Sequence, residues 1–314
     1  MKGGKRDFPE RFQNTVGRPL DFSVRLSDYS HFKIGGEADY FFCARSPHEL
    51  KKTISLAREF SLYHTIMGGG YNLLFEDEGF RGLVIKNQVE KIDRQDKELI
   101  RCASGSLLKD VLEWCAEHEL GGLEFMAGIP GTVGGAVYGN AGAFDEEIGD
   151  RVVEAVLYDK SDKDVKINRE YFSFDYRYSS LKKRPDVVLE VILRVEERRR
   201  SQIEANIAKN MEWRTKRHPP WDIACAGSFF QNPVSLEGKK IAAAQLLDRV
   251  GAKGLREGDA MVYDGHANFI INRGHACASD VMSLASELKR RVKEEFGIDL
   301  KEEVIHVPAT PPSR

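Results

Sequence analysis

The spacing of apolar and polar residues along this chain alternates between a helical pattern and a strand pattern. The clearest helical segment begins at Ser46, where the letters SPHE form a capping-box pattern with proline at the first helical position. The apolar residues from Leu50 to Phe60 then recur on one helical face. The same criteria predict further helices over 107–121, 198–218, 241–250 and 279–296.

Short runs rich in β-branched and aromatic residues predict the strands between these helices. Strands are expected over 63–67, 83–86, 152–159, 186–197, 268–272 and 302–307, and Gly35-Gly36 suggests a turn between two more. Strands and helices in this order indicate an α+β protein and not a regular βαβ array.

The composition also divides the chain. A charged, helix-like run begins near residue 198 and ends at Pro219-Pro220, which places a domain boundary near 198. The resulting prediction is an arm over 1–24, loosely attached, a first domain over 25–198 with two subdomains, a second over 199–307 and a disordered tail over 308–314.

Charge and cysteine content narrow the class of protein. The net charge of −2 creates no global field that would attract nucleic acid, so any anion site must be local. The five cysteines include no CxxC pair, which favours reduced thiols in the cytoplasm over a disulfide frame or a metal site. The basic N-terminus lacks the apolar run of a signal peptide, and no segment is long enough to span a membrane.

The segment over 121–144, GGLEFMAGIPGTVGGAVYGNAGAF, is the most unusual in the chain, with eight glycines and no lysine or arginine. This glycine density disfavours a helix or strand interior. Its interleaved large apolar residues disfavour a flexible linker. We therefore expect an ordered ligand loop in which main-chain N–H groups bind an anion, with a helix start adding its dipole.

A second glycine-rich loop, GGGYN, covers 68–72 and follows a predicted strand. Neither loop has the dinucleotide fingerprint GxGxxG or the GK[ST] of a phosphate-binding loop. Two such loops together suit a ligand with a pyrophosphate at its centre, such as a dinucleotide. Two structural turns are the alternative.

Four residues could carry chemistry, although each also has an ordinary structural interpretation. Ser228 lies in AGSFFQNP with no GxSxG elbow, so a turn serine is the simpler interpretation. Arg177 could stack on neighbouring aromatic rings or bind a carboxylate. Glu303 could be a solvated edge carboxylate, and His266 is more often structural than catalytic.

Taken together, several motifs resemble one known family. FKIGGEADYFF, GGGYNLLFEDEGFRGLVI, the long glycine segment, FDYRYSSLK, AGSFFQNP, GDAMVYDGHANFIIN and LKEEV occur in the order typical of UDP-N-acetylenolpyruvoylglucosamine reductases, over about residues 20–307. The resemblance implies a two-part FAD-binding domain of the vanillyl-alcohol-oxidase (PCMH) type and a smaller α+β substrate domain. It also implies a cytoplasmic flavoprotein of peptidoglycan and cell-wall synthesis, and we expect a monomer.

In that family, NADPH reduces non-covalently bound FAD, and the flavin then reduces a UDP-sugar enolpyruvyl ether to UDP-N-acetylmuramate. The resemblance gives Arg177 and Glu303 the stabilisation of negative charge and gives Ser228 the protonation of C2. A glutamate in that role must be protonated, which requires burial. The implied cofactor-binding residues are Gly68, Gly69, Gly70, Tyr71, Asn72, Leu73, Gly128, Ile129, Pro130, Gly131, Gly134, Gly135, Ala136, Asn140, Ala141 and Gly142. The implied substrate-binding residues are Tyr176, Lys216, Arg217 and Asn232, and no metal is implied.

The chain departs from the family pattern at three positions. Tyr71 replaces the usual serine, His31 the usual threonine and Gln231 the usual lysine. The basic residue expected to meet the substrate diphosphate is displaced, so the candidates are Arg214, Lys216, Arg217 and His218.

Two other functions are compatible with the sequence. A flavin-dependent oxidase or dehydrogenase of an alcohol would keep the fold, and a non-catalytic UDP-sugar or nucleotide-binding module would lack flavin chemistry.

Overall fold

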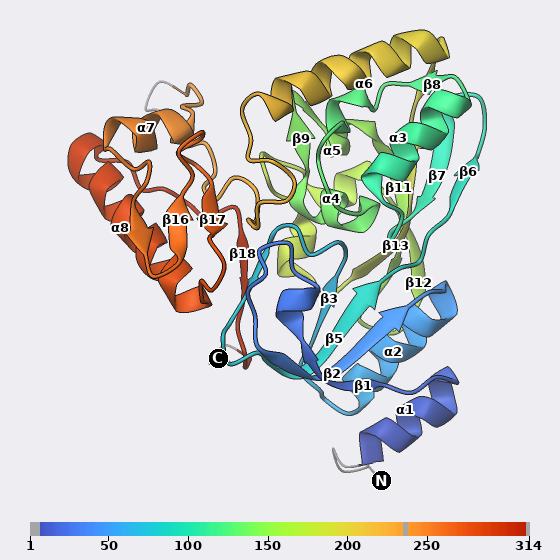
Figure 1. Cartoon of the computed structure of the whole chain (residues 1–314). Helices are drawn as coiled ribbons and strands as arrows, with labels where there is room; N and C mark the ends of the chain where they lie inside the picture. Colours follow the sequence, from blue (N-terminus) through green and yellow to red (C-terminus); the bar gives the residue numbers. More distant parts are fainter. Residues whose placement is uncertain (1–6, 235–237, 312–314) are drawn as a thin grey trace. The chain divides into compact units, whose positions relative to one another are not determined.

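The computed structural model describes residues 7–234 and 238–311. These residues form two compact units. Within the described residues, the first unit covers 7–22, 40–69 and 83–214, and the second covers 23–39, 70–82, 215–234 and 238–311. The described structure mixes helices and strands in both units, as expected for an α+β protein (Figure 1).

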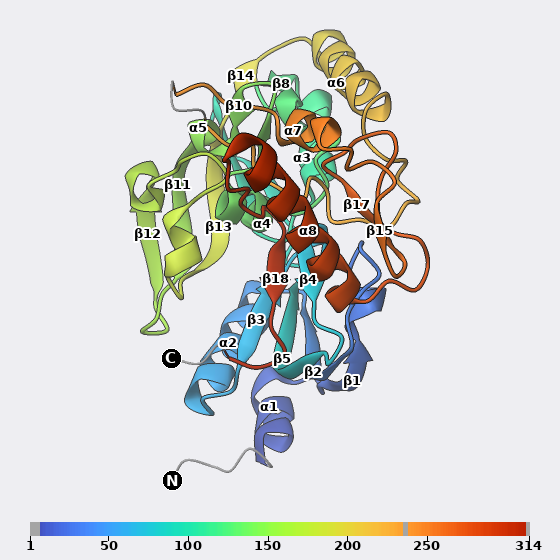
Figure 2. The ribbon, with the colours of Figure 1, turned by 90° about the vertical axis from the view of Figure 1, so that its left-hand side faces the viewer.

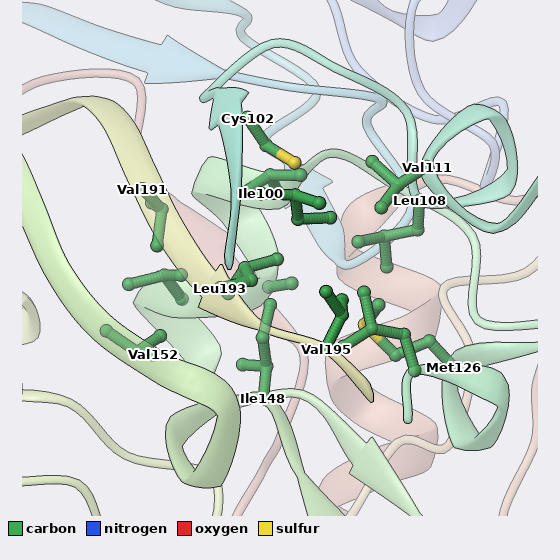
Figure 3. Packing of buried hydrophobic residues seen from close by; sticks show 14 of the residues in the cluster. Ile100, Cys102, Leu108, Val111, Met126, Ile148, Val152, Val191, Leu193 and Val195 are labelled. Atoms are coloured by element: carbon green, nitrogen blue, oxygen red, sulfur yellow. The ribbon is translucent and has the colours of Figure 1, made fainter. Parts of the chain in front are cut away.

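An antiparallel sheet of five strands is the framework of the first unit. Its order is β12-β11-β13-β7-β6, and the strands span Asp164–Asn168, Val152–Tyr158, Val187–Arg194, Leu99–Ala103 and Ile92–Arg94. One face carries the core shown in Figure 3, where Ile100, Val191 and Leu193 of the sheet pack near Leu108 and Val111 of helix α3 (Leu108–Glu117). All five of these side chains are buried. The unit also contains the helices α4 (Val133–Gly139), α5 (Ile148–Arg151) and α6 (Arg200–Thr215) and the short strand pairs β8 (Leu120–Gly121) with β14 (Glu196–Glu197) and β9 (Gly142–Ala143) with β10 (Glu146–Glu147).

A second sheet has the order β1-β2-β5-β3, with strands Asp21–Arg25, Glu37–Ala44, Phe80–Asn87 and His64–Met67. The predicted helix is confirmed as α2 (Pro47–Glu59). The Ser46 side chain accepts the N–H of Glu49, and the side chains of Leu50 and Ile54 are fully buried. Strand β3 pairs in parallel with β5, which contains the strand predicted over 83–86.

Residues 7–22 differ from the loosely attached arm that the sequence suggested. They contain helix α1 (Phe8–Val16), in which Phe8 and Phe12 are buried in a cluster with Phe42 and Leu50. Two buried phenylalanines one helical turn apart anchor the helix, whatever the polarity of its neighbours. Residues 1–6 of that predicted arm lie outside the described part of the chain.

The second unit packs helix α8 (Ala278–Phe296) against a three-stranded sheet of order β15-β16-β17 (Arg256–Glu257, Ala260–Val262 and Ile270–Asn272), as Figure 1 shows. Helix α7 (Ala243–Arg249) packs on α8. Strand β18 (Ile305–Val307) pairs in parallel with β4 (Leu73–Phe75), and the two lie side by side in Figure 2.

The end of the described chain also differs from the expected disordered tail. Ala309 is buried, and its backbone bonds to the carboxylate of Glu76 and to the N–H of Arg81. Residues 312–314 of the predicted tail lie outside the described part. The division into a cofactor domain over 25–198 and a substrate domain over 199–307 stays a prediction, because compactness does not test which residues bind which ligand.

Candidate functional site

The glycine segment of the first unit is ordered and contains a short helix, in agreement with the helix start expected within it. Helix α4 begins after Thr132, whose side chain accepts the N–H of Gly135 at 3.3 Å. Val133 and Val137 are fully buried on its inner face. Their burial outweighs the low helix propensity of the glycines, because packing contributes more than propensity does in a short helix.

Two positions of this segment require glycine, one because no side chain would fit and the other because of its positive φ. A Cβ at Gly134 would lie 2.9 Å from both Cβ and the carbonyl oxygen of Ser104. Gly131 has φ +125°, and a Cβ at this position would meet no heavy atom within 4 Å, so a ligand could reach its backbone. The helix start therefore combines tight packing on one side with open backbone on the other.

The first glycine loop starts in the same unit. A Cβ at Gly68 would lie 2.3 Å from Oγ1 of Thr132, so the loop touches the start of α4 directly. Gly68 and Gly69 belong to the first unit and Gly70 to the second. Thus the two glycine loops expected to share a ligand do meet at Gly68.

Arg177 lies in a strained turn beside the glycine segment. Its φ is +53°, in the left-handed region that a residue with a side chain rarely adopts. Its Nη2 donates to the Gly142 carbonyl at 2.8 Å, and its guanidinium carbon lies 5.0 Å from the centre of the Tyr176 ring. Lys182 donates to the Arg177 carbonyl at 2.8 Å. Strain of this kind is often retained where a side chain must be aimed at a ligand.

Asn140 joins two parts of the first unit through its side chain. It ends α4 in the left-handed conformation, and its amide donates to Glu147 at 2.6 Å and to the Asp175 carbonyl at 2.9 Å. Its side-chain oxygen accepts the N–H of Gly149 at 3.0 Å. Asn140 thus joins the glycine segment to the turn that carries Arg177, and ligand binding through its side chain stays untested.

The sequence named Arg214 only as one of four basic candidates, and the structure distinguishes it from the others. Its Nε is buried and, among the described residues, has no hydrogen-bond partner. Its side chain lies against Gly128, where a Cβ would come within 2.6 Å of Arg214 Cδ, and its guanidinium lies 6.0 Å from the Phe144 ring. Burial, with the positive charge of Arg177 as a second cause, lowers the pKa of Arg214 to about 10. A buried cation near another cation indicates a site that attracts an anion.

The second unit holds the other end of the first glycine loop. The Asn72 side chain donates to the Glu303 carbonyl at 3.1 Å, and the Asn72 carbonyl accepts the N–H of Ile305 at 3.0 Å. Glu303 therefore precedes strand β18 and does not begin it, which corrects the strand predicted over 302–307. Asn72 therefore fixes the backbone around Glu303, one of the predicted catalytic residues, through two hydrogen bonds.

Ser228 and Glu303 lie on neighbouring segments of the second unit. The N–H of Glu303 donates to the Phe229 carbonyl at 2.8 Å. Phe229 and Phe230 are buried, while Ser228 is half-buried after Gly227, whose φ is +79°. The structure therefore places the segments of these two predicted catalytic residues side by side, whereas Arg177 belongs to the other unit.

The predicted substrate-binding residues differ in their surroundings. Lys216 and Arg217 are exposed, and Tyr176 is half-buried beside Arg177. The Oδ1 of Asn232 accepts the N–H of Ala243 at 2.9 Å, so it holds the start of α7. Asn232 would bind a substrate through the second lone pair of that oxygen or through its amide NH₂ group.

A surface depression of about 470 Å³ in the first unit includes none of the predicted site residues. Arg94 and Arg198 in its wall pair with Glu197 and Glu124, so their charges are compensated. Within residues 7–234 and 238–311, no group of three or more His, Cys, Asp or Glu side chains could hold a metal ion. No helix in the same ranges has the length and apolar character to cross a membrane.

Comparison with known proteins identifies the family. The C-terminal domain of UDP-N-acetylenolpyruvoylglucosamine reductase matches residues 219–307, and an FAD binding domain matches residues 38–165. UDP-N-acetylenolpyruvoylglucosamine reductase 1 of Bacillus cereus is 36% identical over 299 residues, covering 94% of this chain and 96% of that protein. The reductase of Solibacter usitatus is 36% identical over 301 residues, covering 91% and 96%.

A solved structure agrees. The crystal structure of UDP-N-acetylenolpyruvylglucosamine reductase from Thermus caldophilus is similar with a TM-score of 0.76 and 32% identity, covering 92% of this chain and all of that chain. Similarity of this degree over nearly the full length confirms the resemblance and the two-part fold class that it implied. The chain belongs to the UDP-N-acetylenolpyruvoylglucosamine reductase family.

Proposed function

We propose that this chain catalyses the NADPH-dependent reduction of UDP-N-acetyl-3-O-(1-carboxyvinyl)-glucosamine to UDP-N-acetylmuramate through bound FAD, a step of peptidoglycan precursor synthesis. The observation that carries the proposal is the full-length similarity to reductases of that name. An FAD-dependent oxidase or dehydrogenase of an alcohol is disfavoured by the same observation, because the C-terminal domain also matches the reductase.

The residues present fit FAD. Gly131, just before α4, leaves open space where a side chain would lie, and Gly68 packs against Thr132 without room for a side chain. Gly70 and Gly128 both have φ +73°. This left-handed conformation is common in loops whose backbone N–H groups bind anions. FAD bound there would supply the hydride-transfer chemistry. Residues of both glycine loops would hold it, with Arg214 as a nearby cation.

Arg177 would bind the carboxylate of the enolpyruvyl group. A guanidinium binds a carboxylate through two parallel hydrogen bonds, and that interaction strengthens as negative charge moves onto the carboxylate. The strained turn and the bond to the Gly142 carbonyl orient Arg177, so little reorganisation is needed when the substrate binds. Arg214 adds positive charge to the same region.

Ser228 would donate the proton to C2, and Glu303 would stabilise the developing charge. The N–H of Phe229 donates to the Asn268 carbonyl at 2.8 Å, so the residue after Ser228 is fixed on the buried core. A serine is a weak acid, but a carbanion-like carbon is a strong base, and a hydroxyl held within hydrogen-bond reach can protonate it. Glu303 can help only when protonated.

We also propose that the protein is a cytoplasmic monomer that binds no nucleic acid. All five cysteines are free thiols, which suits a reducing compartment. A net charge of −2 offers no general attraction to nucleic acid. Light scattering after gel filtration tests the monomer, and a dimer mass would contradict it.

The central experiment is a visible absorption spectrum before and after anaerobic NADPH, followed by the enolpyruvyl substrate. We expect a yellow protein that NADPH bleaches and the substrate restores. If NADPH bleaches the flavin and the substrate does not restore it, the substrate assignment is wrong. A colourless protein that binds the sugar nucleotide would instead favour a binding module.

Ser228→Ala tests the proton donor. The variant should keep NADPH-dependent bleaching and lose about 10²–10⁴-fold in substrate-dependent reoxidation, since positioned proton transfer contributes that range. Ser286→Ala is the matched control, because Ser286 is exposed on α8 and bonds only within its own helix. Equal loss of both half-reactions in Ser228→Ala would contradict the assigned role.

A further inference from the structure

We propose that His31, as an imidazolium, is a positioning residue that joins the first glycine loop to the segment leading into Ser228. Only the expected effect on the rate of reoxidation by the substrate rests on the proposed function, whereas the positioning of the segment by His31 does not. All the residues involved belong to the second unit.

The two ring nitrogens of His31 face two backbone carbonyls. Nδ1 lies 2.9 Å from the Cys225 oxygen and Nε2 lies 3.1 Å from the Trp221 oxygen. A carbonyl oxygen only accepts hydrogen bonds, and a neutral imidazole carries a single N–H. Both contacts can therefore be hydrogen bonds only when the ring is doubly protonated.

The backbone of His31 holds the first glycine loop at the same time. Its N–H donates to the Gly70 carbonyl at 3.0 Å, and its ring centre lies 5.1 Å from that of Tyr71. His31 and Tyr71 are two of the three positions at which the chain departs from the usual residues of the family, and they contact each other. This contact suggests that the two substitutions form one local arrangement and should be tested together.

The segment that His31 holds leads directly to Ser228. The Ala224 carbonyl accepts the N–H of Asn272 at 2.8 Å, and Cys225 pairs with Ile271. The two carbonyls bound by His31 thus lie on either side of Ala224, just before the turn at Gly227. With a neutral imidazole, strand β17 would still hold Ala224, but His31 could donate to only one of the two carbonyls, so its link from this segment to the glycine loop would be weakened.

The charge state of His31 should be stable at neutral pH. The Cys225 side chain is the largest cause that raises the pKa of His31, to about 9, and hydrogen bonds to the Cys225 and Trp221 carbonyls act in the same direction against partial burial. Among the titratable residues of the described chain, Cys225 acts on the ring and Tyr71 has its own ring beside it. Because folding raises this pKa above the ordinary value of about 6.5, the contribution is complete below that value and is lost as pH rises through about 9.

The first test measures the protonation of His31 directly in the full-length holoprotein. With ¹⁵N-labelled histidine, we expect both ring nitrogens of His31 to be protonated at pH 7.5 and to titrate near pH 9, and His31→Gln identifies the signal by removing it. A neutral His31 ring at pH 7.5 would overturn the proposal. This measurement does not depend on activity, so it decides the proposal even if the enolpyruvyl substrate proves wrong.

The second test separates positioning from a general structural role. His31→Gln should slow reoxidation by the enolpyruvyl substrate roughly tenfold at pH 7.5, as expected for a misplaced proton donor, and leave the NADPH half-reaction within about twofold. The wild-type reoxidation rate should fall above pH 9, and that fall should be absent in His31→Gln. An unchanged rate and pH profile in a folded, flavin-loaded His31→Gln would overturn the proposal.

Two further variants complete the test. His275→Gln, at an exposed histidine of the same unit, should change neither rate nor pH profile. His31→Thr with Tyr71→Ser introduces the usual residue types together, and its effect should be smaller than the sum of the two single effects, since contacting residues are not additive. Strictly additive effects would contradict the idea that the pair acts as one arrangement.

Discussion

Arg214→Met should make the flavin-free protein more stable and its ligand binding weaker. The buried Nε of Arg214 has no partner in the described structure, and an unsatisfied buried polar group costs about 1–3 kcal/mol. Methionine has a similar length and helix propensity, so it can fill the space beside Gly128 without charge. The variant also removes the repulsion between Arg214 and Arg177.

The loss of one cation–π contact opposes this gain in stability, and that loss is small. The contact of the Arg214 guanidinium with the Phe144 ring is worth about 0.5–1 kcal/mol, and methionine recovers part of it as a sulfur–aromatic contact. The net expectation is a gain of about 1 kcal/mol in the free energy of unfolding. The same variant removes a cation near the glycine segment, so affinity for the anionic ligands should fall about tenfold or more.

Urea unfolding of the flavin-free protein measures the first effect by linear extrapolation, and flavin fluorescence or calorimetry measures the second. Arg200→Met is the matched control, because Arg200 starts the same helix α6 but is exposed and paired with Glu204. That control should alter neither quantity appreciably. If Arg214→Met destabilises the protein while Arg200→Met does not, Arg214 is a structural residue and the interpretation as an anion site fails.

Two other predictions concern stability. Gly134→Ala should destabilise the protein by about 2 kcal/mol, because its Cβ would lie 2.9 Å from Ser104, whereas Gly139→Ala in the same helix meets nothing within 4 Å and should be neutral or up to about 1 kcal/mol stabilising. Thermal unfolding of both variants checks this, and equal effects would contradict the packing argument. Burial lowers the pKa of His64, so the unfolded chain takes up the proton first and stability should fall as pH drops below about 6.5. His64→Gln should reduce the fall in urea midpoint between pH 7.5 and 5.5, and an undiminished fall would exclude His64 as its cause.

The sequence by itself predicted those parts of the fold that depend on neighbouring residues. The helix after Ser46 forms because a local side chain caps it and a local apolar face buries it. The helix predicted over 279–296 is α8, which ends at Gly297 in the left-handed conformation that glycine permits. The family followed from motifs whose order along the chain is itself a property of the sequence.

Tertiary structure decided what depends on residues far apart in the chain. Burial of Val133 and Val137 stabilises α4 despite its glycines, so tertiary packing decided how far the expected helix start extends. The end of the chain is ordered through Ala309 because Glu76 and Arg81, more than two hundred residues earlier, bind its backbone.

The candidate site shows the same division. The sequence indicated Ser228 and Glu303, but only the fold places their segments side by side through the Phe229 carbonyl. Arg214 was one of four basic candidates until its buried Nε distinguished it. The sequence states which chemical groups the chain contains. Burial and hydrogen-bond geometry arise only once the chain has folded, and this geometry determines which of those groups can bind a ligand.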